Sequence, residues 1–166
     1  MTAGAPSARV FVGLGANLGD PRAALIEALA EIERLPGTSR MATSRFYRSA
    51  PVEASGPDFV NAVVEFRSTL APLELLHGLQ AIERHHGRQR PFRNAPRTLD
   101  LDLLLHGDTA LHSEELTLPH PRMHRRAFVL LPLAELAPDL VLPGLGPLPP
   151  WLQACRDQQI EVLAPC

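Results

Sequence analysis

Residues 98–105 read TLDLDLLL, and this alternation decides the fold around them. On a strand, successive side chains point to opposite faces, so Asp100 and Asp102 share one face, about 6–7 Å apart along the chain. Leu99, Leu101 and Leu103 share the other face and point into a core. Two carboxylates with no basic residue between them repel each other, which costs free energy unless a cation lies there. Their oxygen atoms suit Mg²⁺, and the pair could bridge two such ions. Two solvated surface aspartates are the alternative, because D-x-D is a common pattern.

The chain on both sides of this strand is rich in cations. The segment before it carries Arg84, Arg88, Arg90, Arg93 and Arg97, with His85 and His86. Forked guanidinium groups together with metal-binding carboxylates match what a polyphosphate needs, whereas a solvated loop or an RNA-binding patch is the alternative. Residues 120–126, HPRMHRR, add further cations. His120 and His124 have the spacing of a zinc pair on a helix, but Pro121 lies between them and no Glu follows His120, which excludes that motif.

Strand-like and helical segments alternate along the rest of the chain. Hydrophobic periodicity, caps and breakers predict strands at 10–16, 42–47, 59–67 and 98–105, and helices from Asp20-Pro21 to Pro36, from Pro72 to Gly87, from about His124 and near Trp151. Pro132 is expected to bend or end the third helix. The order β-α-β-β-α-β-α predicts the α+β class, as a ferredoxin-like α/β sandwich: a mainly antiparallel sheet with helices packed on one face.

Two further segments suggest a ligand site. Residues 13–19, GLGANLG, are one residue too long for the dinucleotide-binding fingerprint and predict a tight strand-to-helix turn, in which glycines let a flat ligand approach the backbone. Phe59 and Asn61 alternate onto one face of a strand. An aromatic ring beside an amide can stack on a heterocycle and bond to it, although a core Phe with a satisfied Asn is the simpler interpretation.

Length and composition limit the remaining possibilities. The 166 residues suit one domain, 1–166, with residues 1–8 expected to be flexible. The net charge of -2 and the pI of about 6.4 give no general attraction to nucleic acid or anionic membranes. The sequence has no run of 18 apolar residues and no signal peptide pattern at its start. We therefore expect a cytoplasmic monomer without nucleic-acid or membrane partners, in which Cys155 and Cys166 are free thiols.

Seven motifs together resemble one known family. They are VGLGANLGD, FYRSAPV, PDFVNAV, GRQR, RNAPRTLDLDLLL, LPHPRM and RAFVLLPL, and they run in that order from about Arg9 to Pro143. This set is similar to 6-hydroxymethyl-7,8-dihydropterin pyrophosphokinase. The resemblance implies transfer of pyrophosphate from Mg-ATP to the hydroxymethyl group of 6-hydroxymethyl-7,8-dihydropterin, with release of AMP, in folate biosynthesis.

The resemblance also implies a role for individual residues. Asp100 and Asp102 match the ligands of two Mg²⁺ ions and, with Arg88 and Arg97, the catalytic set. The residues that match the ATP site are Leu76, Gln80, Glu83, Arg88, Arg97, Leu103, Thr117, His120 and Arg126. The residues that match the pterin site are Ser49, Ala50, Val52, Phe59, Asn61 and Phe128. Asn94-Ala95 stand where some members carry Trp-Gly, so we expect Phe92 to supply the apolar contact of that loop.

Two other functions fit parts of the pattern. An RNA-binding module on the same architecture would need aromatic residues on two central strands, yet aromatic residues are only 5% of this chain and no K/R-G-F/Y-type motif is present. A metal-dependent nucleotide hydrolase would use the same two carboxylates. It would release AMP or ADP without any pterin, whereas the resemblance implies AMP release that depends on pterin.

Overall fold

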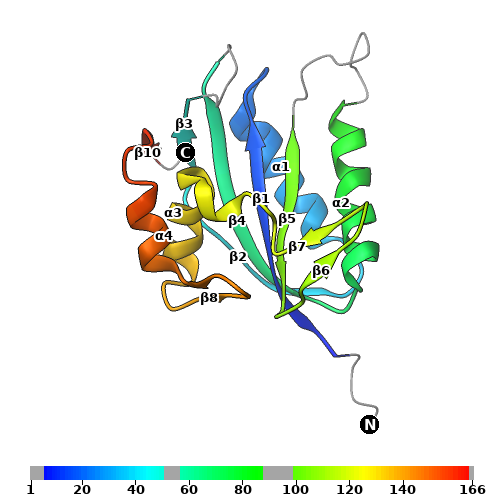
Figure 1. The fold of residues 1–166 in the computed structure, drawn as a ribbon. Coiled ribbons are helices and arrows are strands. Elements are labelled where there is room, and N and C mark those ends of the chain that lie inside the picture. The colour runs from blue at the N-terminus through cyan, green and yellow to red at the C-terminus, as the bar shows by residue number, and fades with distance from the viewer. Residues whose placement is uncertain (1–5, 51–56, 88–98, 165–166) are drawn as a thin grey trace.

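The computed structural model describes residues 6–50, 57–87 and 99–164, which form one antiparallel sheet with helices on both faces (Figure 1). The strand order in the sheet is β10-β3-β4-β1-β5, and β2 also pairs with β4. Two small hairpins, β6-β7 and β8-β9, lie outside it. The helices and strands are β1 Ala8–Ala16, α1 Pro21–Glu33, β2 Thr38–Thr43, β3 Tyr47–Ser49, β4 Phe59–Ser68, α2 Pro72–Gly87, β5 Asp100–His106, β6 Leu111–His112, β7 Thr117–Leu118, the 3-10 helix η1 Met123–Arg125, α3 Ala127–Leu136, β8 Val141–Leu142, β9 Gly146–Pro147, α4 Leu148–Ala154 and β10 Ile160–Val162.

Helices α1 and α2 cover one face of the sheet. Asp20 caps α1, because its side chain accepts a hydrogen bond from the backbone N of Ala23 at 3.2 Å, and Pro21 begins the helix. Both helices bury residues at helical spacing against alternate residues of the central strands. This core contains Leu25, Ala28, Ile32, Leu75, Leu79 and Ile82 from the helices, and Val10, Val12, Leu14, Val64, Leu101 and Leu103 from the strands. The predicted helices and the inward-facing leucines of β5 are confirmed.

Helices α3 and α4 cover the opposite face, so the predicted arrangement with helices on one face only is wrong. A second core joins Phe11, Val63 and Leu104 of the sheet to residues of η1, α3 and α4 that include Met123, Leu130, Leu133 and Leu148. The physical reason is that β1 and β4 carry apolar side chains on both faces, and each face must be covered. The mainly antiparallel α+β architecture itself is confirmed.

Two local predictions also need correction, and of the two outcomes expected at Pro132, a bend or an end of the helix, the end does not occur. Residues 42–47 form no single strand, because β2 ends at Thr43 and Ser44 instead exchanges hydrogen bonds with Val63 before β3 begins. Pro132 lies inside α3 without ending it; it removes one backbone donor, while Val129, Leu130 and Leu133 pack the helix onto the sheet. Gly13 and Gly15 belong to β1, and of the three glycines only Gly19, at φ 64°, lies in the following turn. Near the N-terminus, Ala8 belongs to β1 and Ser7 accepts hydrogen bonds from Arg67, and the flexibility expected for residues 1–8 stays a prediction.

A carboxylate joins α3 to the sheet. Glu135 accepts hydrogen bonds from the Tyr47 hydroxyl at 2.6 Å, from the backbone N of Arg45 at 2.9 Å and from its Nε at 3.3 Å. Burial and this carboxylate raise the pKa of Tyr47 to about 12. Burial alone would raise the pKa of Glu135, but the bonds from Tyr47 and Arg45 outweigh it and hold that pKa below its ordinary value. Glu135 is therefore ionised at neutral pH and fixes α3 beside β3.

No helix in the described segments has the length and apolar character needed to cross a membrane.

Candidate active site

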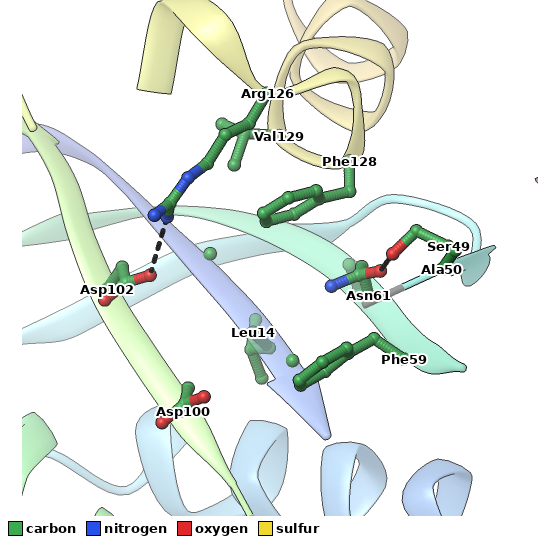
Figure 2. Close-up of a pocket in the computed structure, with 13 residues that line it drawn as sticks. Leu14, Ser49, Ala50, Phe59, Asn61, Asp100, Asp102, Arg126, Phe128 and Val129 are labelled. Carbon is green, nitrogen blue, oxygen red and sulfur yellow. Dashed lines mark hydrogen bonds and ion pairs between the residues drawn. The ribbon is translucent and has the colours of Figure 1, made fainter. Parts of the chain in front are cut away.

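A cavity of about 200 Å³ opens where β4, β1 and β5 pass beneath the start of α3 (Figure 2). Its lining comes from five stretches of sequence that are far apart along the chain. The lining residues are Gly13, Leu14, Gly15, Ser49, Ala50, Phe59, Asn61, Ala62, Asp100, Asp102, Arg126, Phe128 and Val129. They divide into two parts with different chemistry. We call Ser49, Ala50, Phe59, Asn61 and Phe128 the amide half. We call Asp100, Asp102 and Arg126, together with the neighbouring His120, the acidic half.

The amide half is held by a buried hydrogen bond. The Ser49 hydroxyl donates to Oδ1 of Asn61 at 2.6 Å, and both residues are buried. Because that bond occupies the amide oxygen, the amide nitrogen of Asn61 points into the cavity (Figure 2). The rings of Phe59 and Phe128 lie on either side of this amide (Figure 2). Two aromatic faces and one directed donor are suited to a flat, polar-edged heterocycle.

Glycines of β1 form the floor between the two halves. In the sheet Gly15 pairs with Asn61 of β4 on one side and with Asp100 of β5 on the other, and Gly13 pairs with Asp102. A Cβ on Gly15 would lie 3.1 Å from Nδ2 of Asn61 and 3.8 Å from the Phe59 ring. The missing side chain therefore leaves bare backbone on which a ligand can lie.

In the acidic half, Asp102 lies near Arg126 and His120 without close contact. The Arg126 guanidinium lies 3.9 Å from Oδ2 of Asp102, and Nε2 of His120 lies 4.0 Å from Oδ1. Burial, opposed by Asp102 and assisted by Arg126, holds the pKa of His120 below its ordinary value. Arg126 also lies over the Phe128 ring at 5.4 Å, so it contacts both halves. The 42% exposed side chain of Asp102 offers carboxylate oxygens to the cavity, which fit a hard cation such as Mg²⁺.

The β5 strand and Arg126 are each held by a side chain that bonds to their backbone. Glu83 of α2 accepts a hydrogen bond from the backbone N of Leu101, between the two aspartates, at 2.8 Å. Arg126 is an extended residue between η1 and α3. The Gln158 amide accepts from the backbone N of Ala127 at 2.9 Å and donates to the carbonyl of Arg125 at 2.8 Å. Gln158 thus bonds to the peptide groups on both sides of Arg126 and fixes the direction of its side chain.

Most of the predicted pterin and metal residues come together in this cavity. Ser49, Ala50, Phe59, Asn61, Phe128, Asp100, Asp102 and Arg126 all line it, and His120 stands beside Asp102. Val52, Arg88 and Arg97 lie outside the described residues, as do Phe92 and Asn94-Ala95.

Six described residues predicted for the nucleotide site do not line the cavity, and one of them, His120, lies beside the lining residue Asp102. Leu76 and Leu103 are buried in the core beneath α1 and α2. Thr117 belongs to the β6-β7 hairpin, while Gln80 and Glu83 are partly buried on α2. His85 and His86, grouped with the basic segment in the sequence, instead contact Glu31 of α1.

Five lining residues were not predicted as individual site residues, although glycines of residues 13–19 were expected to let a flat ligand approach the backbone: Gly13, Leu14, Gly15, Ala62 and Val129. The signal for the glycines was present, since Gly13 and Gly15 are two apart and a strand places such residues on one face. The other three line the cavity from positions that are also typical of a core, and no pattern in the sequence separates them from it.

Comparison with known proteins gives one consistent result. The sequence pattern of the family described as 7,8-dihydro-6-hydroxymethylpterin-pyrophosphokinase (HPPK) matches residues 11–138. The chain is 51% identical over 156 residues to a 2-amino-4-hydroxy-6-hydroxymethyldihydropteridine pyrophosphokinase of Pseudomonas aeruginosa, covering 93% of this chain and 96% of that protein. It is 43% identical over 156 residues to the protein of the same name from Haemophilus influenzae, covering 93% and 98%.

The fold resembles that of a longer solved protein. Plasmodium falciparum HPPK-DHPS, crystallised with SDX-DHP, superposes with a TM-score of 0.72 at 13% identity. The alignment covers 89% of this chain and 44% of that one. At this identity the likeness supports the fold alone, and the chain spans less than half the length of that protein.

Proposed function

Because the chain belongs to the 7,8-dihydro-6-hydroxymethylpterin-pyrophosphokinase family, we propose that the cavity between β4, β1, β5 and α3 is its active site. The protein is a pyrophosphokinase: it transfers a pyrophosphoryl group to hydroxymethyldihydropterin in folate biosynthesis. We also propose the role of each residue, the number of metal ions, and ATP as the donor that leaves as AMP.

One observation carries this assignment: the two halves of the cavity face each other across a single glycine strand. Asn61, Gly15 and Asp100 are cross-strand neighbours. Adjacent strands lie about 4.8 Å apart, so Asn61 and Asp100 are separated by about 10 Å across the floor. A fused two-ring heterocycle with a one-carbon arm can bridge that length. Its ring would bind in the amide half while its hydroxyl reaches the acidic half.

The amide half would bind and orient the pterin. The ring would stack between Phe59 and Phe128, and Nδ2 of Asn61 would donate to an acceptor on the ring edge. Asn61 keeps its orientation because Ser49 holds its oxygen. Such positioning turns a reaction between two ligands into an effectively unimolecular one. Because phosphoryl transfer needs little covalent help from the protein, positioning supplies a large part of the rate acceleration.

The acidic half would bind the phosphates. Asp100 and Asp102 fit two Mg²⁺ ions, which when bound would neutralise phosphate charge and lower the cost of deprotonating the hydroxyl. Arg126 and His120 would contact the triphosphate, together with Arg88 and Arg97, which lie outside the described residues. The hydroxymethyl oxygen then bonds to the β-phosphorus, the bond from that phosphorus to the α-phosphate oxygen breaks, and AMP leaves. The proton of the hydroxyl passes to solvent, since no side chain of the described cavity is assigned as its base.

Product analysis tests the proposal directly. The enzyme is incubated with Mg-ATP and 6-hydroxymethyl-7,8-dihydropterin, and the products are measured by mass spectrometry. We expect AMP and the pterin pyrophosphate in equal amounts, and no AMP when the pterin is omitted. AMP or ADP formed without pterin would instead support the nucleotide hydrolase, and filter retention of RNA would support the binding module.

We further propose that residues 1–166 form a single pyrophosphokinase domain that works as a cytoplasmic monomer. The support for one domain is that both hydrophobic cores are built on the two faces of the same sheet.

A further inference from the structure

A group of metal-ligand side chains lies on the other side of the sheet from the cavity, where the ends of α1 and α2 meet. Glu31 belongs to the last turns of α1, and His85 and His86 to the last turn of α2. Nδ1 of His85 lies 2.8 Å from Oε1 of Glu31, and Nε2 of His86 lies 3.2 Å from Oε2. Two imidazoles from one helix therefore converge on both oxygens of one carboxylate from the other helix.

This convergence is unusual for residues that are adjacent in a helix. Neighbouring side chains on a helix point about 100° apart and do not normally meet. Here His85 uses its near nitrogen and His86 its far nitrogen, and the two rings stand edge to face with centroids 5.5 Å apart. One ligand atom from each of the three residues lies within 4.8 Å of the others. In a tetrahedral zinc site such atoms are about 3.3 Å apart, which small side-chain rotations would reach.

Burial also favours a specific site. The side chains of His86 and Glu31 are only 8% and 18% exposed, whereas that of His85 is 62% exposed. Burial holds the side chains of His86 and Glu31 in place. Because His85 is exposed, an ion can enter the site from solvent on its side. Nδ1 of His86 lies 4.0 Å from a carboxylate oxygen of Glu27. A carboxylate near the second nitrogen is the arrangement that orients a histidine whose first nitrogen binds metal.

We propose that Glu31, His85 and His86 form a binding site for a transition-metal ion of the Zn²⁺ class, separate from the Mg²⁺ site at Asp100 and Asp102. Imidazole nitrogens with one carboxylate suit Zn²⁺, Co²⁺ or Ni²⁺, whereas Mg²⁺ prefers an all-oxygen set. Three protein ligands leave a fourth position for water. A bound ion would tie the end of α2 to α1 and add its binding free energy to the stability of the fold.

The chain offers a matched control for a simple hydrogen bond between imidazole and carboxylate. Nε2 of His77 on α2 lies 2.7 Å from Oε2 of Glu115, and no second imidazole joins this pair among the described residues. If paired histidine and glutamate alone were enough to bind the ion, His77 would do so equally well.

The test compares metal-free wild-type protein with the variants His85→Ala/His86→Ala, Glu31→Gln and His77→Ala. Zn²⁺ is titrated against a chromophoric chelator in millimolar Mg²⁺, which keeps the aspartates occupied. We expect the wild type and His77→Ala to bind one more equivalent of Zn²⁺ than the double variant. Zn²⁺ should also raise the Tm of the wild type by a few degrees, and Glu31→Gln should reduce that shift.

Two results would overturn the proposal. One is the same number of Zn²⁺ equivalents in the wild type and in the double variant. The other is a Zn²⁺-induced Tm shift that persists in the double variant. Should the double variant fail to fold by circular dichroism, His85→Ala provides the same comparison, because its exposed side chain can be removed without disturbing the core.

Discussion

The two halves of the cavity share one floor but are built in different ways. The amide half is held by contacts within the protein: a buried 2.6 Å hydrogen bond holds Asn61, and the ring of Phe128 is carried by a helix that Glu135 fixes to β3. In the acidic half, the Asp102 carboxylate lies 3.9 Å from the Arg126 guanidinium and 4.0 Å from the His120 imidazole. Asp102 therefore approaches both side chains without closing into a hydrogen-bonded pair with either.

This difference follows from what each half must bind. A neutral heterocycle binds more tightly to a site that is already ordered, because no binding free energy is then lost in ordering the side chains. A polyphosphate brings its own charge and cations, so carboxylates and guanidiniums that satisfied each other fully would have to be separated first. Substitutions in the two halves should therefore act on different kinetic constants, and the following predictions test that division.

The largest effect is expected from Asp100→Asn and Asp102→Asn. Each substitution removes a proposed metal ligand worth several kcal/mol of transition-state stabilisation, so kcat should fall by about a thousandfold. Pterin affinity, measured by fluorescence titration, should stay within about threefold of the wild type, because the amide half is untouched. The Tm should be maintained. Near-normal turnover at ordinary Mg²⁺ concentrations would contradict the metal assignment.

The next effect is expected from Asn61→Ala, which removes the proposed donor to the pterin. Without this donor, the acceptor on the bound ring loses its partner, which costs about 1–3 kcal/mol, so pterin affinity should weaken roughly five- to hundredfold, with a much smaller change in the KM for ATP. The matched control is Ser49→Ala, which removes only the group that orients the amide and should weaken affinity less. Equal losses of pterin and ATP affinity in Asn61→Ala would remove the division between the halves.

A smaller effect is expected from adding one carbon to the floor. The Cβ of Gly15→Ala would press against Asn61 Nδ2 at 3.1 Å and occupy the ligand's surface, so pterin affinity should fall by roughly three- to tenfold. In Gly13→Ala the new carbon meets only Leu104, at an ordinary 3.6 Å, and affinity should change by less than about twofold. Fluorescence titration of both variants decides the matter, and equal losses would show that the floor is not contacted.

The smallest effect is expected from Gln158→Ala, which acts on the acidic half at a distance. Loss of both bonds around Arg126 should let its side chain wander and lower kcat by a few-fold to about tenfold. Combined with Arg126→Ala, the second substitution should have little further effect on kcat, since both remove the same interaction. Additive losses in this double-mutant cycle would mean that Gln158 does not work through Arg126.

The sequence allowed prediction of those parts of the site that strand alternation makes visible. Asp100 and Asp102, and likewise Phe59 and Asn61, are two apart on strands, so each pair shares a face whatever surrounds it. The pairing of β4 and β5 with the two sides of β1 could not be read in this way, because register depends on contacts between distant segments. The sequence therefore did not predict that Gly13 and Gly15 lie between the two halves, although it did suggest that a ligand could approach these glycines.

Predictions of secondary structure were wrong where tertiary contacts outweighed the local preference of the residues. The strand predicted at 42–47 is divided because Ser44 bonds to Val63, a residue far along the chain. Pro132 was expected to bend or end the third helix, and it does not end it, because packing preserves the helix past this residue. The alternation of the strand predicted Leu103 to point into a core, where both Leu76 and Leu103 lie. The resemblance that assigns these two residues to the ATP site concerns a part of the site to which the cavity does not extend.

The bare floor at Gly15 has a consequence for heritable variation. Glycine codons differ by one nucleotide only from codons of residues that carry a β-carbon, from stop codons, or from other glycine codons. Every single-nucleotide change that replaces Gly15 therefore adds atoms beside Asn61, on the surface where the substrate is proposed to lie. If an inhibitor bound against this backbone, a substitution of Gly15 that weakened the inhibitor would also weaken binding of the substrate.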